Sequence, residues 1–257
     1  MVALFVVWII WPKRNAEQGK SSAHSSLQEL LKQSVILKKD RELMKLKEVY
    51  QEILTEYSDY EHIDAVQNEL DDLNIQIIYS NTMTPKTVMH EVQNKDTLAV
   101  IAKKYGTTVD LIKMNNNLKN DVIRVGQKLR VWMGNFNIFV DKSQNILILK
   151  DSNEVVKVYK VSTGENNSTP VGQFKIINKL KDPVWFNKGI VVPPESPQNV
   201  LGSRWLGFDL PGYGIHGTIE PESIGRQVTA GCVRMRNQDV EELYILVPAG
   251  AQVVIVD

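Results

Sequence analysis

The only cysteine of this chain, Cys232, follows a histidine, His216, after a short polar loop. A thiol is a weak nucleophile at neutral pH, with a free pKa near ~8.5, and an imidazole that takes its proton makes it a good one. Gly231 leaves space beside the sulfur, so the amides of Gly231 and Cys232 could approach an oxyanion. Arg234 offers a fork of donors that suits a carboxylate. The pattern indicates acyl transfer, although a lone cysteine is more often a buried apolar residue.

Two segments carry a family resemblance: His216-Gly217-Thr218, and after the loop Thr229-Ala230-Gly231-Cys232-Val233-Arg234. Together they resemble the signature of the L,D-transpeptidase catalytic domain. The resemblance implies that Cys232 is the nucleophile, that His216 is the base, and that the carbonyl just after it, at Gly217, holds its other nitrogen. It also implies that Thr229 and Arg234 contact the substrate. Ala230 departs from the pattern, because a second histidine is usual there.

The same resemblance extends over residues 136–257, through Thr163-Gly164, the segment Thr169-Pro170-Val171-Gly172-Gln173-Phe174, and Trp205-Leu206-Gly207. Alternating apolar residues in the first part of this region predict strands, so a mostly-β domain is expected. Tyr213 and Trp205 could line a substrate groove, but aromatic residues at strand ends are more often part of the core.

Residues 86–133 resemble the lysin motif, or LysM, a βααβ module that binds glycans containing N-acetylglucosamine. Asp96 is expected to cap a helix over 97–105, Gly106 to end it, and a second helix to stop near Asn115. Ligand contact is expected at two loops. Their residues are Asp96, Thr97, Leu98, Asn116, Asn117 and Leu118.

The first eighty residues combine three kinds of sequence. Residues 1–26 hold an eleven-residue apolar run from Met1 to Trp11 and then a polar stretch that is typical of a flexible linker. The run is shorter than the ~20 residues that cross a bilayer, so it is either part of a membrane anchor or a short interfacial or signal-like segment. Trp8 and Trp11 suit a membrane interface, which favours a truncated or minimal anchor. Residues 27–80 show apolar spacing of three and four, which predicts a helical hairpin or spacer, with a β-rich end over 75–79.

Composition limits the partners. Thirty basic and thirty acidic side chains cancel, which argues against nucleic acid. His24, His62 and His90 are scattered and Cys232 stands alone, so no zinc-site spacing is present, and no metal or cofactor is expected. Asn237 is expected to cap a helix that begins there. The oligomeric state is left open.

These observations predict a multi-domain α+β protein of the cell envelope, outside the cytoplasm or in a periplasm, either free or anchored to the membrane. The resemblance implies that Cys232 attacks the carbonyl of the third residue of a peptidoglycan tetrapeptide stem, releases D-alanine and forms a 3-3 cross-link, and that carbapenems acylate it. Water or a protein amine could replace the acceptor stem. The alternative is a LysM glycan-binding protein with an inactive catalytic domain. A cysteine protease is disfavoured because its cysteine commonly precedes its histidine.

Overall fold

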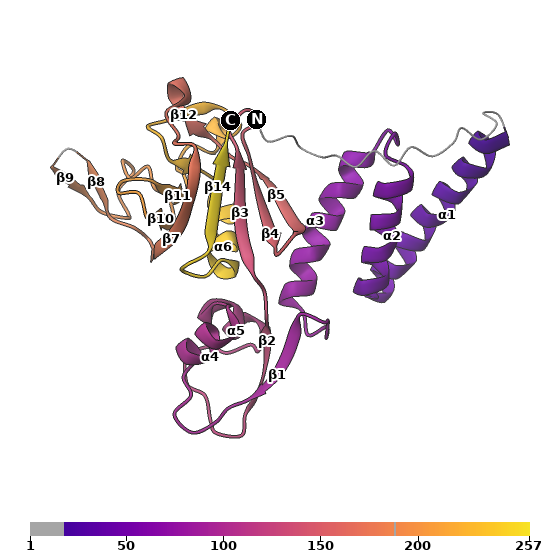
Figure 1. The fold of residues 1–257 in the computed structure, drawn as a ribbon, viewed down its shortest axis with the longest axis horizontal. Coiled ribbons are helices and arrows are strands. Elements are labelled where there is room, and N and C mark those ends of the chain that lie inside the picture. Colours follow the sequence, from indigo (N-terminus) through magenta and orange to yellow (C-terminus); the bar gives the residue numbers. More distant parts are fainter. Residues whose placement is uncertain (1–17, 188) are drawn as a thin grey trace. The chain divides into compact units, whose positions relative to one another are not determined.

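The computed structural model describes residues 18–187 and 189–257, and these described residues fall into two compact units, one that ends at Leu73 and one from Asn74 to Asp257; their elements are drawn in Figure 1. The apolar run over 1–11, with the anchor expected there, lies outside the described residues. Within the described part, none of the helices has the length and apolar character needed to cross a membrane.

The first unit is helical. It holds α1 (Gln18–Asp40), α2 (Leu43–Glu56) and most of α3 (Ile63–Tyr79). One face of α2 is apolar and buried, as expected for an amphipathic helix, and an ion pair of 2.6 Å between Lys38 Nζ and Glu69 Oε2 joins α1 to α3. Helix α1 therefore packs beside α2, and the ion pair links α1 to α3.

Two expectations for this region were wrong. Helix α1 begins at Gln18, inside the stretch that was expected to be a flexible linker. The β-rich segment over 75–79 is the last part of α3. Ile75, Ile77 and Ile78 are each at most 5% exposed, so tertiary packing outweighs their preference for strands.

The LysM region has the expected βααβ order: β1 (Thr87–Glu91), α4 (Leu98–Tyr105), α5 (Val109–Asn115) and β2 (Lys128–Trp132), with β1 antiparallel to β2. Its helices pack on this two-stranded sheet around a small apolar core. The buried core residues are Val92, Leu98, Ile101, Ala102, Ile112, Leu129 and Val131. Thr97 caps α4 by accepting from the Val100 amide, which corrects the cap expected at Asp96, and Gly106 ends α4 in the left-handed conformation.

The mostly-β domain is built on one mixed eight-stranded sheet in the order β13-β11-β10-β7-β14-β3-β4-β5. Its elements are β3 (Phe136–Asp141), β4 (Ile146–Asp151), β5 (Glu154–Lys160), β6 (Thr163–Gly164), η1 (Glu165–Asn167), β7 (Gly172–Lys181), β8 (Trp185–Asn187), β9 (Ile190–Val192), β10 (Arg204–Phe208), β11 (Gly214–His216), η2 (Pro221–Ser223), β12 (Gln227–Thr229), β13 (Val233–Arg234), α6 (Asn237–Leu246) and β14 (Gln252–Val256).

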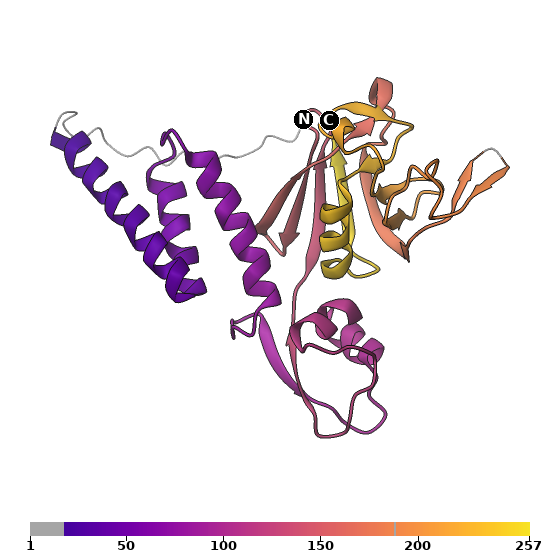
Figure 2. The same cartoon turned by 180° about the vertical axis from the view of Figure 1, so that it is seen from behind.

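Three features of this domain determine where the site forms. The short strands β11 and β13 run parallel at one end of the sheet, while β12 pairs with β6 in a separate two-stranded sheet. Helix α6 follows β13 directly and packs against β10 and β11, on the face of the sheet seen in Figure 2. The end of the sheet that carries His216 and Cys232 is therefore supported by a helix.

Candidate functional site

Sheet pairing brings Cys232 and His216 to adjacent strands. His216 is the last residue of β11, and Cys232 immediately precedes β13, whose Val233 pairs with Ile215. The sulfur lies beside the start of β11, because the thiol contacts the Gly212 carbonyl at 3.5 Å and receives a hydrogen bond from the Gly214 amide. The parallel strand pair thus brings the segments of Cys232 and His216, the residues predicted to be nucleophile and base, next to each other.

The His216 ring is buried and has a fixed orientation. It is only 4% exposed, stacks on Trp205 with ring centroids 6.1 Å apart, and its Nδ1 lies 2.6 Å from the Gly217 carbonyl oxygen. A carbonyl only accepts, so Nδ1 carries the proton and Nε2 of the neutral ring is able to accept one. Burial lowers the pKa of His216 to about 4, and the charge of Arg234 acts in the same direction.

Cys232 is a thiol at neutral pH in this setting. It is partly exposed, yet desolvation raises the pKa of its thiol above the ordinary value, while the Gly214 hydrogen bond and the Arg234 charge oppose that rise. The resting pair is therefore a neutral thiol with a neutral imidazole. A neutral thiol becomes a nucleophile only when a base removes its proton, and a neutral imidazole can accept one.

The loop before Cys232 is closed by Thr229. Its hydroxyl donates to the Cys232 carbonyl at 2.6 Å and accepts from the Gly231 amide at 3.2 Å. Gly231 has φ +132°, which suits only glycine, and a Cβ there would lie 2.7 Å from the Tyr213 ring. The Gly231 amide, expected at the oxyanion, is thus engaged within the loop, and Thr229 is buried with its hydroxyl committed to this backbone.

Arg234 is 8% exposed, and its Nη1 donates to Glu220 Oε2 at 2.9 Å and to Ser223 Oγ at 3.0 Å. Within the described residues its Nε is buried without a hydrogen-bond partner. These two hydrogen bonds of the guanidinium use Nη1 alone, and the protein therefore holds this end of the side chain in place.

Asn237 joins two backbone segments near His216: the residue before β10 and the loop that follows β11. The sequence did not reveal this role. Its Oδ1 accepts from the amides of Ser203 at 3.1 Å and Thr218 at 3.0 Å. A Cβ on Gly217 would lie 2.1 Å from this oxygen, so the close approach requires glycine. The expected cap on α6 was wrong, because α6 has Arg236 as its N-cap residue and no side-chain cap.

Most side chains that were expected to contact a glycan at the two LysM loops are bonded or buried within the protein. Asp96 Oδ2 accepts from the Gln93 amide at 2.8 Å and lies 2.9 Å from His90 Nε2, and Leu98 is 2% exposed in the core. The Asn116 amide group bonds to the backbone of Ile112 and Arg130. Asn117 is exposed and Leu118 half-buried. Of these side chains only that of Asn117 is exposed without a contact described above, because the half-buried Leu118 packs against the LysM core.

Comparison with known proteins finds a family match for each of the two modules. The pattern of the L,D-transpeptidase catalytic domain matches residues 135–255, and that of the LysM domain matches residues 90–132. The Bacillus subtilis protein YkuD, whose name places it among L,D-transpeptidases, is 33% identical over 174 residues, which cover 65% of this chain and 97% of YkuD. This chain belongs to the L,D-transpeptidase family.

Other members show how far the similarity reaches. YqjB of Bacillus subtilis is 41% identical over 126 residues, covering 47% of this chain and 70% of YqjB. Among solved structures, an L,D-transpeptidase from Mycobacterium smegmatis matches with a TM-score of 0.42 and 19% identity over 52% of this chain and 65% of that one. The catalytic domain from E. faecium matches with a TM-score of 0.40 and 22% identity over 48% of this chain and 98% of that one.

Sequence reasoning missed several groups at the site of this family member. The Gly212 carbonyl and the Gly214 amide contact the sulfur, but backbone partners have no side-chain signal. The Gly-Tyr-Gly-Ile-His run, in which two glycines flank an aromatic residue just before the base, was the available hint. Among the described residues, no cluster of His, Cys, Asp or Glu could hold a metal ion.

Proposed function

We propose that this protein is a peptidoglycan L,D-transpeptidase that acts through a Cys232 thioester. The observation that carries the proposal is the His216 ring, buried, neutral and held through Nδ1 by the Gly217 carbonyl, on the strand next to the only cysteine. This arrangement leaves Nε2 as the acceptor for the thiol proton. Family membership supports the reaction class.

The first half-reaction follows from these protonation states. His216 Nε2 takes the thiol proton as Cys232 attacks the carbonyl of the third stem residue. The Cys232 amide is the donor that we assign to the oxyanion, because the Gly231 amide is bonded to Thr229. The imidazolium is a strong acid in its buried site, so it passes its proton to the nitrogen of D-alanine, which leaves with the C–N bond broken.

The second half-reaction releases the enzyme. An amine of a neighbouring stem attacks the thioester carbonyl, gives a proton to His216 and forms an amide, and the thiolate of Cys232 recovers that proton. The product is a cross-link between two third residues. Water at the same step would give a carboxypeptidase, and a protein amine would give an anchoring reaction.

Arg234 and the glycan loops have supporting roles in this proposal. We assign Arg234 to a substrate carboxylate on the chemistry of its guanidinium, and its charge favours the thiolate. Thr229 and Asn237 act as positioning residues for Cys232 and for the His216 loop. Tyr213, over Gly231, and Trp205, beside His216, border the reacting groups. The LysM loops hold the glycan, which places the protein in the cell envelope outside the cytoplasm.

The test is D-alanine release from purified disaccharide tetrapeptide, with chromatographic analysis of the dimer. We expect the full-length protein to release D-alanine and form the 3-3 dimer, and Cys232→Ser to lose both by roughly a thousandfold or more. Release without dimer would identify water as the acceptor. Equal release by both proteins would reject the thioester.

A further inference from the structure

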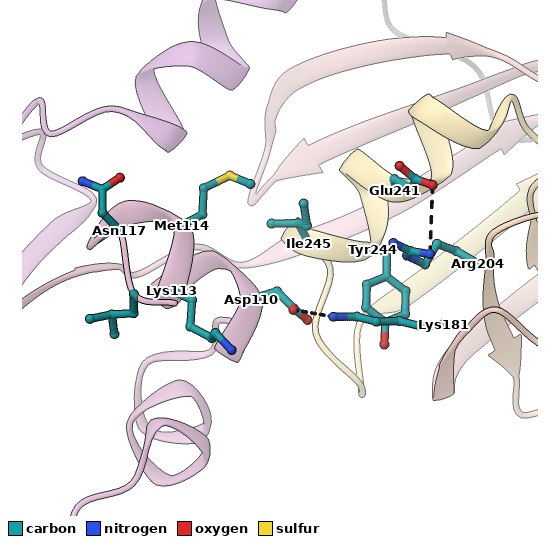
Figure 3. A pocket seen from close by; sticks show the side chains of 10 residues that line it. Asp110, Lys113, Met114, Asn117, Lys181, Arg204, Glu241, Tyr244 and Ile245 are labelled. Carbon is teal, nitrogen blue, oxygen red and sulfur yellow. Dashed lines mark hydrogen bonds and ion pairs between the residues drawn. The ribbon is translucent and has the colours of Figure 1, made fainter. Parts of the chain in front are cut away.

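A pocket of about 410 Å³ lies where the LysM module meets the catalytic domain, within the second unit (Figure 3). LysM contributes Asp110 from α5 and Asn117 and Leu118 from the loop that follows. The catalytic domain contributes Lys181 from β7, Arg204 from β10 and Glu241 from α6. Its volume falls in the usual range for small-molecule sites, ~300–1,000 Å³.

The two modules are joined by direct contacts beside this pocket. The Thr108 hydroxyl donates to the Ile245 carbonyl, and an ion pair of 2.8 Å links Lys181 Nζ to Asp110 Oδ1. Leu111 of α5 is fully buried although it is absent from the LysM core, and α5 packs against α6. The pocket walls are thus held by contacts of both modules.

The charges of the pocket compensate one another. Lys181 pairs with Asp110, and Arg204 Nη1 lies 4.0 Å from Glu241 Oε1, as the dashed lines in Figure 3 mark. Lys181 and Glu241 remain 52% and 42% exposed, so their donors and acceptors are accessible. Leu118 adds apolar surface beside them. Lys113, the third cation of the lining, pairs with Asp121 outside it at 2.6 Å. Charged donors and acceptors that are paired within the protein, next to apolar surface, suit a neutral ligand with many hydroxyl or amide groups.

We infer that this pocket binds an N-acetylated sugar unit of the same glycan strand whose stem enters the catalytic site. The inference rests on the proposed function and names the part of the substrate that the catalytic domain recognises. Asn117 and Leu118, assigned to glycan contact from sequence, line the pocket together with catalytic-domain residues. A strand held at the LysM loop therefore continues onto the catalytic domain.

The distance from the pocket to the site suits the stem. Helix α6 has Glu241 and Tyr244 at the pocket and Asn237 at the His216 loop. The rise of ~1.5 Å per helical residue separates Tyr244 from Asn237 by about 10 Å along the axis. Three extended stem residues span about 10 Å at ~3.3–3.6 Å each. A stem that begins on a sugar in the pocket is therefore long enough to reach the His216 loop with its third residue.

The first experiment measures binding of an N-acetylglucosamine oligomer to the full-length protein by calorimetry. Glu241→Ala removes an acceptor but no contact between the modules. Lys181→Ala removes a donor together with the ion pair to Asp110, so Asp110→Ala, which breaks the same ion pair and leaves the donor, is measured beside it. We expect the double variant to bind about tenfold more weakly, as the loss of two hydrogen bonds of ~0.5–1.5 kcal/mol each implies. The control is Glu154→Gln, which alters an ion pair with Lys86 away from the pocket and should bind normally. Unchanged affinity in the double variant would overturn the inference, whether or not the protein is a transpeptidase.

The second experiment compares two substrates. The double variant should show a roughly tenfold higher KM for disaccharide tetrapeptide and an unchanged KM for the tetrapeptide that lacks sugar. Equal changes for both substrates would mean that the variants disturb the catalytic domain and would overturn the inference. If the wild type releases no D-alanine from either substrate, the proposed function fails, and the calorimetry alone decides on the sugar site.

Discussion

The candidate catalytic site and the LysM module are stabilised by different kinds of contact. In LysM, Thr97 and Thr108 each cap a helix by accepting from an amide three residues later, so the stabilising contacts are local in sequence. At the catalytic site, Asn237 bonds to Ser203 and Thr218, and Ser162 pairs with Arg234 through two backbone bonds of 2.8 Å. A reacting pair requires a fixed, desolvated geometry, whereas glycan contact requires only exposed loops on a stable core.

The largest expected effect tests the catalytic side of this comparison. His216→Ala should lower D-alanine release by at least ~100-fold, because the thiol would remain protonated without its base. Binding of N-acetylglucosamine oligomers should be unchanged, since LysM has its own core. His62→Ala is the matched control, because His62 is exposed in the helical unit and should leave release at the wild-type rate. Near-normal release in His216→Ala would remove this residue from the mechanism.

A smaller effect is expected at the long-range contact of Asn237. Asn237→Ala removes the acceptor of two buried amides, and we expect kcat to fall about tenfold with little change in KM, as a loss of ~1.4 kcal/mol implies. Asn237→Asp keeps the oxygen and should restore most of kcat.

The Asp variant also separates positioning from simple stability. Its carboxylate near the His216 loop should raise the pKa of the imidazole, so activity should be lost at a higher pH on the acidic side than in the wild type. A pH–rate profile measures this shift. An Asn237→Ala protein that keeps kcat within about twofold would show that the Asn237 bonds do not position the base.

The smallest expected effect concerns Ala230, the departure from the family pattern. This residue is exposed, and the proposed oxyanion donor is the Cys232 amide, so Ala230→His should change the rate of D-alanine release by no more than about threefold. A rise from no activity to clear activity would show that the natural protein is catalytically silent and favour the glycan-binding alternative.

The same contrast explains what the sequence could predict. The βααβ order of LysM and the αL position of Gly106 follow from neighbouring residues, and the fold class was predicted correctly. The caps show the limit even there: Asp96 was expected to cap α4, but its carboxylate bonds to Gln93 and His90, and Thr97 caps the helix.

Contacts between distant segments could not be predicted. Cys232 and His216 were found by residue type, but their approach depends on a parallel pairing of two short strands that no local pattern encodes. Asn237 was expected to cap a helix because the sequence shows the helix that begins there. It does not show that the amides of Ser203 and Thr218, from two other segments, donate to the Asn237 side chain. The helical form of residues 75–79 likewise depends on burial, which β propensity does not contain.

The central claim is that Cys232 is activated by a buried, neutral imidazole. Intact-mass spectrometry after exposure to a carbapenem tests it directly, because the strained carbonyl acylates an activated thiol and the chain has one cysteine. The wild type should gain the mass of one carbapenem, and Cys232→Ser should gain none.

The rate of this acylation at two pH values tests the state of the base. Because the pKa of His216 is about 4, its ring stays neutral at pH 5.5, and the rate there should remain close to the rate at pH 7. A steep fall, as for an imidazole of ordinary pKa near ~6.5, would contradict the neutral buried base. An unchanged wild-type mass, with alkylation of Cys232 only after denaturation, would contradict the account as a whole.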